Sequence, residues 1–301
     1  MNYFQILGLQ TEPFSTSPDP AFFYRSTSHQ QALQRLEISI RLRRGLSLVL
    51  GDVGTGKTTL ARTLVSALAD DSHVILHMVL DPSYDSEFQF LSALTRMFGV
   101  TPAFKSTLDY REAIERYLFH QGVEEHKIVT LLIDEGQKLT PSLLEELRIL
   151  LNYETNEYKL LQLVIFGQLE LLPRVTRIRN FMDRVVLKYL LNPLDEVETA
   201  ELIRFRLTQA GLPAERSLFT PEAIRAVYRA TQGYPRKIAF LCHNALATLV
   251  MQEQSVVEET LIHQLAQEEV QWSDPTTSVG LPKAGQPKSI GAFGADTEVV
   301  G

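Results

Sequence analysis

The sequence predicts a three-layer α/β/α protein with a parallel five-stranded sheet, followed by an all-helical lid domain. Between residues 45 and 192, short apolar runs alternate with amphipathic stretches, the pattern of parallel strands joined by helices that cover both faces of a sheet. After residue 192 only helical periodicity remains. A glycine-rich stretch, "GDVGTGKTT" from residue 51 to 59, directly follows the first apolar run.

Each apolar run ends near a turn-forming or polar residue, which indicates a buried strand. The expected strands are 46–50, 74–80, 128–133, 160–166 and 185–191. The expected helices around the sheet are 29–44, 57–69, 85–98, 108–121 and 141–152. The expected helices of the lid are 195–210, 220–230, 235–251 and 258–270.

The chain divides into four expected parts. Residues 1–44 form an aromatic and proline-rich wrapping segment with a helix, because its aromatic side chains are costly to leave in water. The α/β core spans 45–192 and the helical lid 193–272. Residues 273–301 have few large apolar side chains, so we expect a disordered tail.

Composition narrows the class of protein. The net charge of −7 over 301 residues argues against coating nucleic acid by bulk charge. Cys242 is the only cysteine, so no intrachain disulfide forms, and it is either a nucleophile or a small buried apolar residue. No stretch reaches the roughly 18 apolar residues of a membrane span. We expect a cytoplasmic protein with no transmembrane segment.

The glycine-rich stretch fits the phosphate-binding pattern G-x-x-x-x-G-K-[ST] between a strand and a helix. Glycines let backbone N–H groups point at phosphate oxygens, and the helix N-terminus adds positive potential. Lys57 is expected to reach the β and γ phosphates, and the Thr58 hydroxyl to bind Mg²⁺. The expected nucleotide-binding residues are Gly51, Asp52, Val53, Gly54, Thr55, Gly56, Lys57, Thr58 and Thr59.

The run "TLLIDEGQ" indicates hydrolysis as well as binding. Asp134 and Glu135 follow the third strand, and ligands of parallel sheets bind at the carboxyl ends of strands. We expect Asp134 to hold Mg²⁺ and Glu135 to orient and deprotonate the attacking water. The alternative is a solvated pair of acids at a strand end.

Further polar residues could complete this site. Gln168 follows the fourth strand and would contact water or the γ phosphate, unless it only begins a helix. Arg184, with Arg177 and Arg179 as rivals, precedes the fifth strand and could reach the phosphate of a neighbouring subunit, unless it is solvated. Arg236 lies in the first turn of a helix, a poor place for a cation unless an anion binds there.

The order of these motifs resembles the AAA+ ATPases, a class of P-loop NTPases. The stretches "YFQILGLQTEPFSTSPDPAFFYRSTSHQQAL", "LLEELRILLNYETNEYKLLQLVIFGQLEL", "NPLDEVETAELIRFRLTQAGL" and "GYPRKI" resemble the ATPase domain of the GspA/ExeA (general secretion pathway protein A) family over residues 1 to 270. The family's membrane span and peptidoglycan-binding region have no counterpart here, so we do not expect direct cell-wall binding.

The resemblance assigns roles residue by residue. It implies Lys57 and Thr58 in the P-loop (Walker A), Asp134 and Glu135 as the Walker B acids, Gln168 as first sensor, Arg236 as second sensor and Arg184 as arginine finger. Three positions depart from the family without removing a catalytic group. These are Asp52 for Glu, Gly136 for Ala and Leu169 for Pro.

The resemblance implies ATP and Mg²⁺ as ligands and a ring or helical homo-oligomer. The expected function is Mg²⁺-dependent ATP hydrolysis that energises or regulates a type II secretion or pilus assembly machine through a protein partner. One alternative is a DNA-transposition ATPase acting as an ATP-dependent target-DNA adaptor, for which Arg35, Arg41, Arg43 and Arg44 form a local basic face. We expect DNA binding, if present, to be weak. A third hypothesis is a nucleotide-gated scaffold with negligible hydrolysis.

Overall fold

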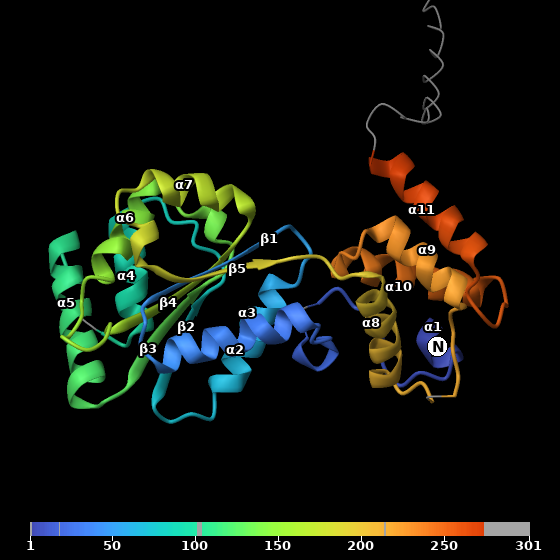
Figure 1. Ribbon diagram of the computed structural model, residues 1–301, viewed down its shortest axis with the longest axis horizontal. Coiled ribbons are helices and arrows are strands. Elements are labelled where there is room, and N and C mark those ends of the chain that lie inside the picture. The colour runs from blue at the N-terminus through green and yellow to red at the C-terminus, as the bar shows by residue number, and fades with distance from the viewer. Residues whose placement is uncertain (1, 18, 101–103, 214, 274–301) are drawn as a thin grey trace, which may run out of the picture.

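The computed structural model describes residues 2–17, 19–100, 104–213 and 215–273. Figure 1 shows a sheet flanked by helices on one side of the molecule and a bundle of helices on the other. The expected disordered tail lies, after Ser273, outside the described residues.

Within the described residues, five strands form one sheet in the order β2-β3-β4-β1-β5, and every neighbouring pair is parallel. β1, β3 and β4 are therefore adjacent, so the segments that follow them meet at one edge of the sheet. The strands are β1 (Leu46–Gly51), β2 (Val74–Val79), β3 (Ile128–Ile133), β4 (Leu161–Gly167) and β5 (Val185–Leu191).

Alternate residues of the central strands pack on opposite faces of the sheet. Val49, Leu132 and Val164 face α2 (Thr27–Arg41) and α3 (Lys57–Leu68). Their neighbours in the strands, such as Leu48, Leu131 and Leu163, belong to the core of the other face. The helices of that second face are α4 (Glu87–Met97), α5 (Thr107–Phe119), α6 (Pro141–Leu150) and α7 (Leu172–Arg177). Both faces are thus covered, as the apolar runs predicted.

The boundaries of two helices differ from expectation for local reasons. α2 begins at Thr27, because the Ser26 hydroxyl accepts a hydrogen bond from the His29 N–H and caps the helix. It ends at Arg41, and Arg43 then adopts a left-handed conformation with φ of 51°. The helix expected at 108–121 ends at Phe119 and continues as a π-helical turn, His120–Glu124.

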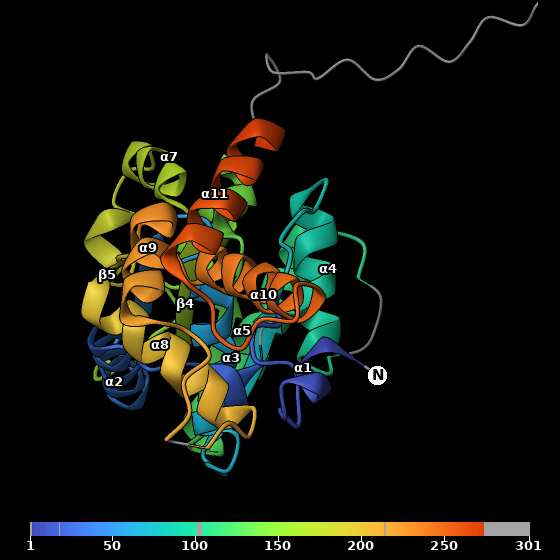
Figure 2. The same ribbon diagram turned by 90° about the vertical axis from the view of Figure 1, so that its right-hand side faces the viewer.

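The second body contains α8 (Glu196–Gln209), α9 (Pro221–Thr231), α10 (Pro235–Met251) and α11 (Glu259–Ser273). Its core also includes Leu7, Leu9 and Phe14 from the N-terminal segment. Figure 1 shows α1 (Tyr3–Ile6) beside these helices, and Figure 2 turns the helical body toward the viewer. The Tyr3 ring packs edge-on against His243 in the middle of α10. The chain therefore starts on the helical body and reaches the sheet with Phe23 and α2.

Short 3₁₀ helices complete the architecture at Pro20–Phe22, Gly136–Lys138, Leu169–Leu171 and Met182–Arg184. Cys242 is fully buried in α10, and burial raises the pKa of its thiol. This environment contradicts the nucleophile alternative and fits a small buried apolar residue. Among the helices described, none combines the length and apolar character needed to cross a membrane.

Candidate nucleotide-binding and catalytic site

The loop between β1 and α3 has the backbone geometry of a phosphate cradle. Gly54 and Gly56 have φ values of 85° and 97°, which favour glycine. Gly56 is also crowded, because a Cβ there would lie 3.0 Å from the His29 Nε2. The loop leads directly into α3, whose first residue is Lys57. The N-terminus of α3 therefore points its free N–H groups toward any anion in the loop.

The Lys57 side chain is folded back into this loop. Its ammonium donates hydrogen bonds to the carbonyl oxygens of Gly51 and Asp52, each at 2.8 Å. Burial lowers the pKa of Lys57, while the carboxylates of Glu135, Asp134 and Asp52 oppose that shift. These acids favour the charged ammonium, which is the state that binds phosphate.

Thr58 and Asp134 form the direct link between the P-loop and the end of β3. The Thr58 hydroxyl donates to Asp134 Oδ2 at 2.6 Å, although the residues are far apart in sequence. Asp134 is only 2% exposed, and its other oxygen accepts the Glu135 N–H at 2.9 Å. A hydroxyl and a carboxylate in contact are oxygen donors that suit Mg²⁺, which usually keeps waters and substrate phosphates as its other ligands. The described residues contain no cluster of three or more His, Cys, Asp or Glu side chains able to hold a metal.

Glu135 begins the turn that follows β3. It has a left-handed backbone with φ of 52°, which turns its side chain away from the strand direction. Its Oε2 accepts a hydrogen bond from Gln137 Nε2 at 2.5 Å. Gln137 was not among the expected site residues.

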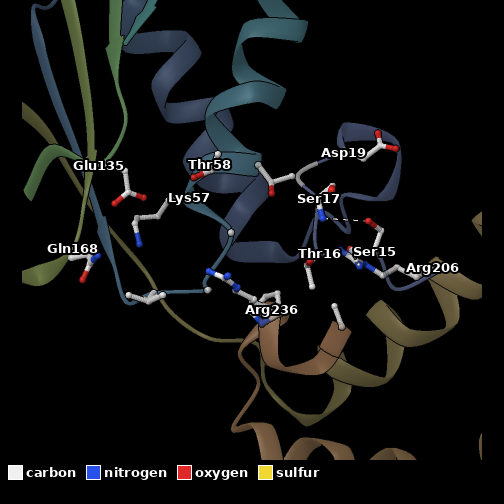
Figure 3. A pocket seen from close by; sticks show the side chains of 16 residues that line it. Ser15, Thr16, Ser17, Asp19, Lys57, Thr58, Glu135, Gln168, Arg206 and Arg236 are labelled. Carbon is white, nitrogen blue, oxygen red and sulfur yellow. Dashed lines mark hydrogen bonds between the residues drawn. The ribbon is translucent and has the colours of Figure 1, made fainter. Parts of the chain in front are cut away.

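A cavity of about 290 Å³ joins these groups to the lid. Figure 3 shows Lys57, Glu135 and Gln168 at one end and Arg206 with Ser15, Ser17 and Asp19 at the other. Arg236 lies between the two ends, in Figure 3 directed toward the P-loop. The lining residues are Ser15, Thr16, Ser17, Asp19, Val53, Gly54, Gly56, Lys57, Thr58, Thr59, Glu135, Gln168, Arg206, Pro235, Arg236 and Ala239.

The first turn of α10 touches the P-loop. The Arg236 N–H donates to the Gly54 carbonyl at 3.3 Å, and the Tyr234 hydroxyl donates to Asp52 Oδ2 at 2.8 Å. The Arg236 side chain is exposed and has no polar partner among the described residues. A guanidinium in this position is available to an anion in the cavity.

Two residues of the site, Arg206 and His29, were not predicted from the sequence. Arg206 of α8 donates to the Ser15 carbonyl at 3.1 Å, and its buried Nε has no partner in the part of the chain described. His29 of α2 contacts the Thr55 carbonyl through Nε2 at 3.0 Å, and Ser26 Oγ lies 2.7 Å from its Nδ1. Burial lowers the pKa of His29 to about 4, so the ring is neutral. Neither residue lies in a local motif that could have revealed its role.

The three candidate finger arginines lie away from the cavity. Arg184 precedes β5, whose first residue pairs with Leu46 at the opposite end of β1 from the P-loop. Its guanidinium donates to the Asn180 carbonyl at 2.8 Å and to Asn152 Oδ1 at 2.6 Å. Arg177 and Arg179 are exposed. None of the three lines the described cavity of its own chain.

The expected basic face is partly neutralised within the chain. Arg41 pairs with Asp71 at 2.5 Å. Arg43 donates to the carbonyls of Gly122 and His126 and stacks over Tyr158. Arg35 lies over the ring of Tyr189. This surface is therefore a weaker candidate for phosphate contacts than the sequence suggested.

Comparison with known proteins defines the class. Residues 40–175 match the AAA domain family. Solved structures share the fold: the ORC2 protein of Aeropyrum pernix has a TM-score of 0.60 at 16% identity, covering 81% of this chain and 68% of that one. Cdc6p of Pyrobaculum aerophilum has a TM-score of 0.62 at 18% identity, covering 81% and 67%. The chain therefore contains an AAA domain and has the P-loop NTPase α/β fold.

A relative with higher sequence identity indicates the family within this class. General secretion pathway protein A of Aeromonas hydrophila is 35% identical over 254 residues, which cover 81% of this chain and 44% of the relative. An uncharacterized HTH-type transcriptional regulator of Methanocaldococcus jannaschii is 28% identical over 159 residues, covering 50% and 38%. The chain belongs to the GspA/ExeA-like AAA ATPases, and it spans less than half the length of these two relatives.

Proposed function

We propose that this chain is a Mg²⁺-dependent ATPase in which Glu135 is the general base. The observation that carries the proposal is the 2.6 Å contact between Thr58 and Asp134, beside a cavity lined by both Lys57 and Glu135. Phosphate-binding groups, Mg²⁺ ligands and a candidate base therefore converge on one site.

Each group has a distinct task in this proposal. The P-loop N–H groups and Lys57 bind the β and γ phosphates, displacing the ammonium from the loop carbonyls. Thr58 and Asp134 hold Mg²⁺, which when bound neutralises charge on the phosphates. Glu135 takes a proton from the attacking water on Oε1, since Oε2 already accepts from Gln137. Gln168 and Arg236 contact the γ phosphate from β4 and from the lid.

Two substitutions test this assignment. Lys57→Ala should abolish ATP binding, because the loop loses its cation. Glu135→Gln should bind ATP normally and hydrolyse it about 10²-fold more slowly or worse, in line with losses of a general base. Wild-type turnover in Glu135→Gln would refute the base assignment, and negligible turnover in the unmodified protein would favour the scaffold hypothesis.

We further propose that the protein works as a ring or helical homo-oligomer in the cytoplasm. Arg184 would complete the site of the neighbouring subunit, since it lies far from the cavity of its own chain. The relationship to general secretion pathway protein A supports a role in energising or regulating a secretion or pilus assembly machine.

A partner protein can be sought by comparing a variant that holds ATP with a variant that binds no nucleotide. Glu135→Gln should accumulate in the ATP-bound form and Lys57→Ala in the empty form. Secretion or pilus components that bind Glu135→Gln and not Lys57→Ala in the presence of ATP would support the proposed process. Equal recovery with both variants would contradict a nucleotide-dependent role.

A further inference from the structure

Gln137 contacts both the proposed base and the end of the neighbouring strand. Its Nε2 lies 2.5 Å from Glu135 Oε2, and its Oε1 lies 3.1 Å from the Gln168 backbone nitrogen. A backbone N–H can only donate, so the amide oxygen of Gln137 must face Gln168. The amide N–H group must then face Glu135, and the orientation of the side chain is fixed by its partners.

Several contacts hold the turn that carries Gln137 in place. The Arg174 guanidinium donates to the Gln137 carbonyl at 2.6 Å, and Lys138 pairs with Asp81 at 2.7 Å. Gly136 packs so closely on β4 that a Cβ there would collide with Ile165. The backbone of Gln137 is therefore placed by β4 and α7, and its side chain transmits that placement to Glu135.

We propose that Gln137 is a positioning residue that links the carboxylate of Glu135 to the end of β4. This inference rests on the proposed role of Glu135. By occupying Oε2, Gln137 leaves Oε1 as the free oxygen for the attacking water. If the γ phosphate displaced Gln168, its backbone N–H, from which the Gln137 side chain accepts a hydrogen bond, would move as well. The Gln137 side chain would follow and so reorient Glu135.

Two variants of Gln137 distinguish a role in positioning Glu135 from a role in stabilising the fold. Gln137→Leu removes both hydrogen bonds at similar volume, and we expect kcat to fall about tenfold with KM for ATP within about twofold, because a misaligned base loses part of the usual 10² to 10⁴-fold contribution. Gln137→Glu keeps an acceptor for Gln168 but faces Glu135 with a second carboxylate. Repulsion between the two carboxylates would move Glu135 out of place, so kcat should fall about tenfold with KM for ATP again within about twofold.

Controls distinguish this inference from its alternatives. Gln252→Glu makes the same charge change at an exposed position after α10 and should leave kcat and KM unchanged. In a Glu135→Gln background, Gln137→Leu should cause no further loss of turnover. ATP affinity and melting temperature report any general damage to the fold.

The outcomes are separable from those of the proposed function. If the wild type hydrolyses ATP and needs Glu135, yet Gln137→Leu or Gln137→Glu keeps kcat within about twofold of the wild type, Gln137 does not position the base. An additional loss in the Glu135→Gln background would likewise overturn the inference. If Glu135→Gln is fully active, the proposed function fails first.

Discussion

The backbone N–H of Arg236 donates to the carbonyl oxygen of Gly54 across 3.3 Å, so the first turn of α10 lies directly on the phosphate-binding loop. A Cβ on Gly54 would come within 3.0 Å of the Arg236 Cβ. The loop and the lid helix can therefore move only together, or by breaking this contact.

Gly54→Ala should separate the loop from the lid. Gly54 has a positive φ, so alanine there adds roughly 1–2 kcal/mol of backbone strain to the crowding against Arg236. We expect ATP affinity to fall at least tenfold, measured by titration with a fluorescent nucleotide. Gly99→Ala is the matched control, because Gly99 also has a positive φ but has no atoms near its Cβ position. Similar losses of affinity in both variants would contradict a specific role for the contact.

His29 should make the stability of the fold depend on pH. Its pKa is lowered by burial to about 4, against about 6.5 in an unfolded chain. Between these values the unfolded chain binds a proton that the folded chain excludes, so the free energy of unfolding falls as the pH drops. The expected loss at pH 5 is about 2 kcal/mol relative to pH 7.5.

Urea denaturation of the wild type and His29→Gln at the two pH values measures this contribution. Glutamine can still donate to the Thr55 carbonyl but does not titrate. The variant should lose about 2 kcal/mol less than the wild type between pH 7.5 and pH 5. Equal losses would show that His29 is protonated in the folded protein or that other groups dominate.

Arg184 should act on the active site of a neighbouring subunit. Arginine fingers contribute about 10³ to 10⁵ in rate where measured, so Arg184→Ala should bind ATP normally and hydrolyse it slowly. The turnover of the wild type should rise faster than linearly with protein concentration. Mixing Arg184→Ala with Glu135→Gln should restore activity, since each variant can supply the group that the other lacks.

Failure of the mixture, with both variants folded and nucleotide-bound, would exclude Arg184 as the finger. Arg177→Ala and Arg179→Ala then identify which exposed neighbour acts instead. Asn152→Ala is a useful companion, because it frees Arg184 from its contact with Asn152 while keeping the charge.

DNA binding should be weak and sensitive to salt. Arg41 and Arg43 already have partners within the chain, and contacts to phosphate through a few arginines fade steeply as salt rises. Fluorescence anisotropy with duplex DNA, with and without ATP, measures this at two salt concentrations. Tight ATP-dependent binding at physiological salt would support the alternative of a DNA-transposition ATPase.

The parts of the fold that local sequence determines were predictable. The five strands follow from apolar runs, and in the central strands β1, β3 and β4 alternate residues pack on both faces of the sheet. The P-loop follows from a fixed spacing of glycines. The contact between Thr58 and Asp134 was foreseeable too, because parallel strands bring their carboxyl ends to one edge.

The remaining site residues depend on tertiary packing. Ser15 and Arg206 meet through a contact between segments 191 residues apart, and no motif marks either one. His29 approaches the P-loop because α2 packs on the same face of the sheet as α3. Gln137 lay inside the run "TLLIDEGQ", yet only the coordinates show that its amide faces Glu135. The assigned roles of all these residues, and the division of the chain at residue 192, stay predictions.

The path of the N-terminal segment has a mechanical consequence. The chain passes between the two bodies twice, from Tyr24 to α2 and again from Leu191 to Leu194, where the flanking residues pack into different cores. Two short covalent connections limit how far the helical body can separate from the sheet. If the contact between Arg236 and Gly54 were broken, the two bodies would therefore stay tethered to each other at two points.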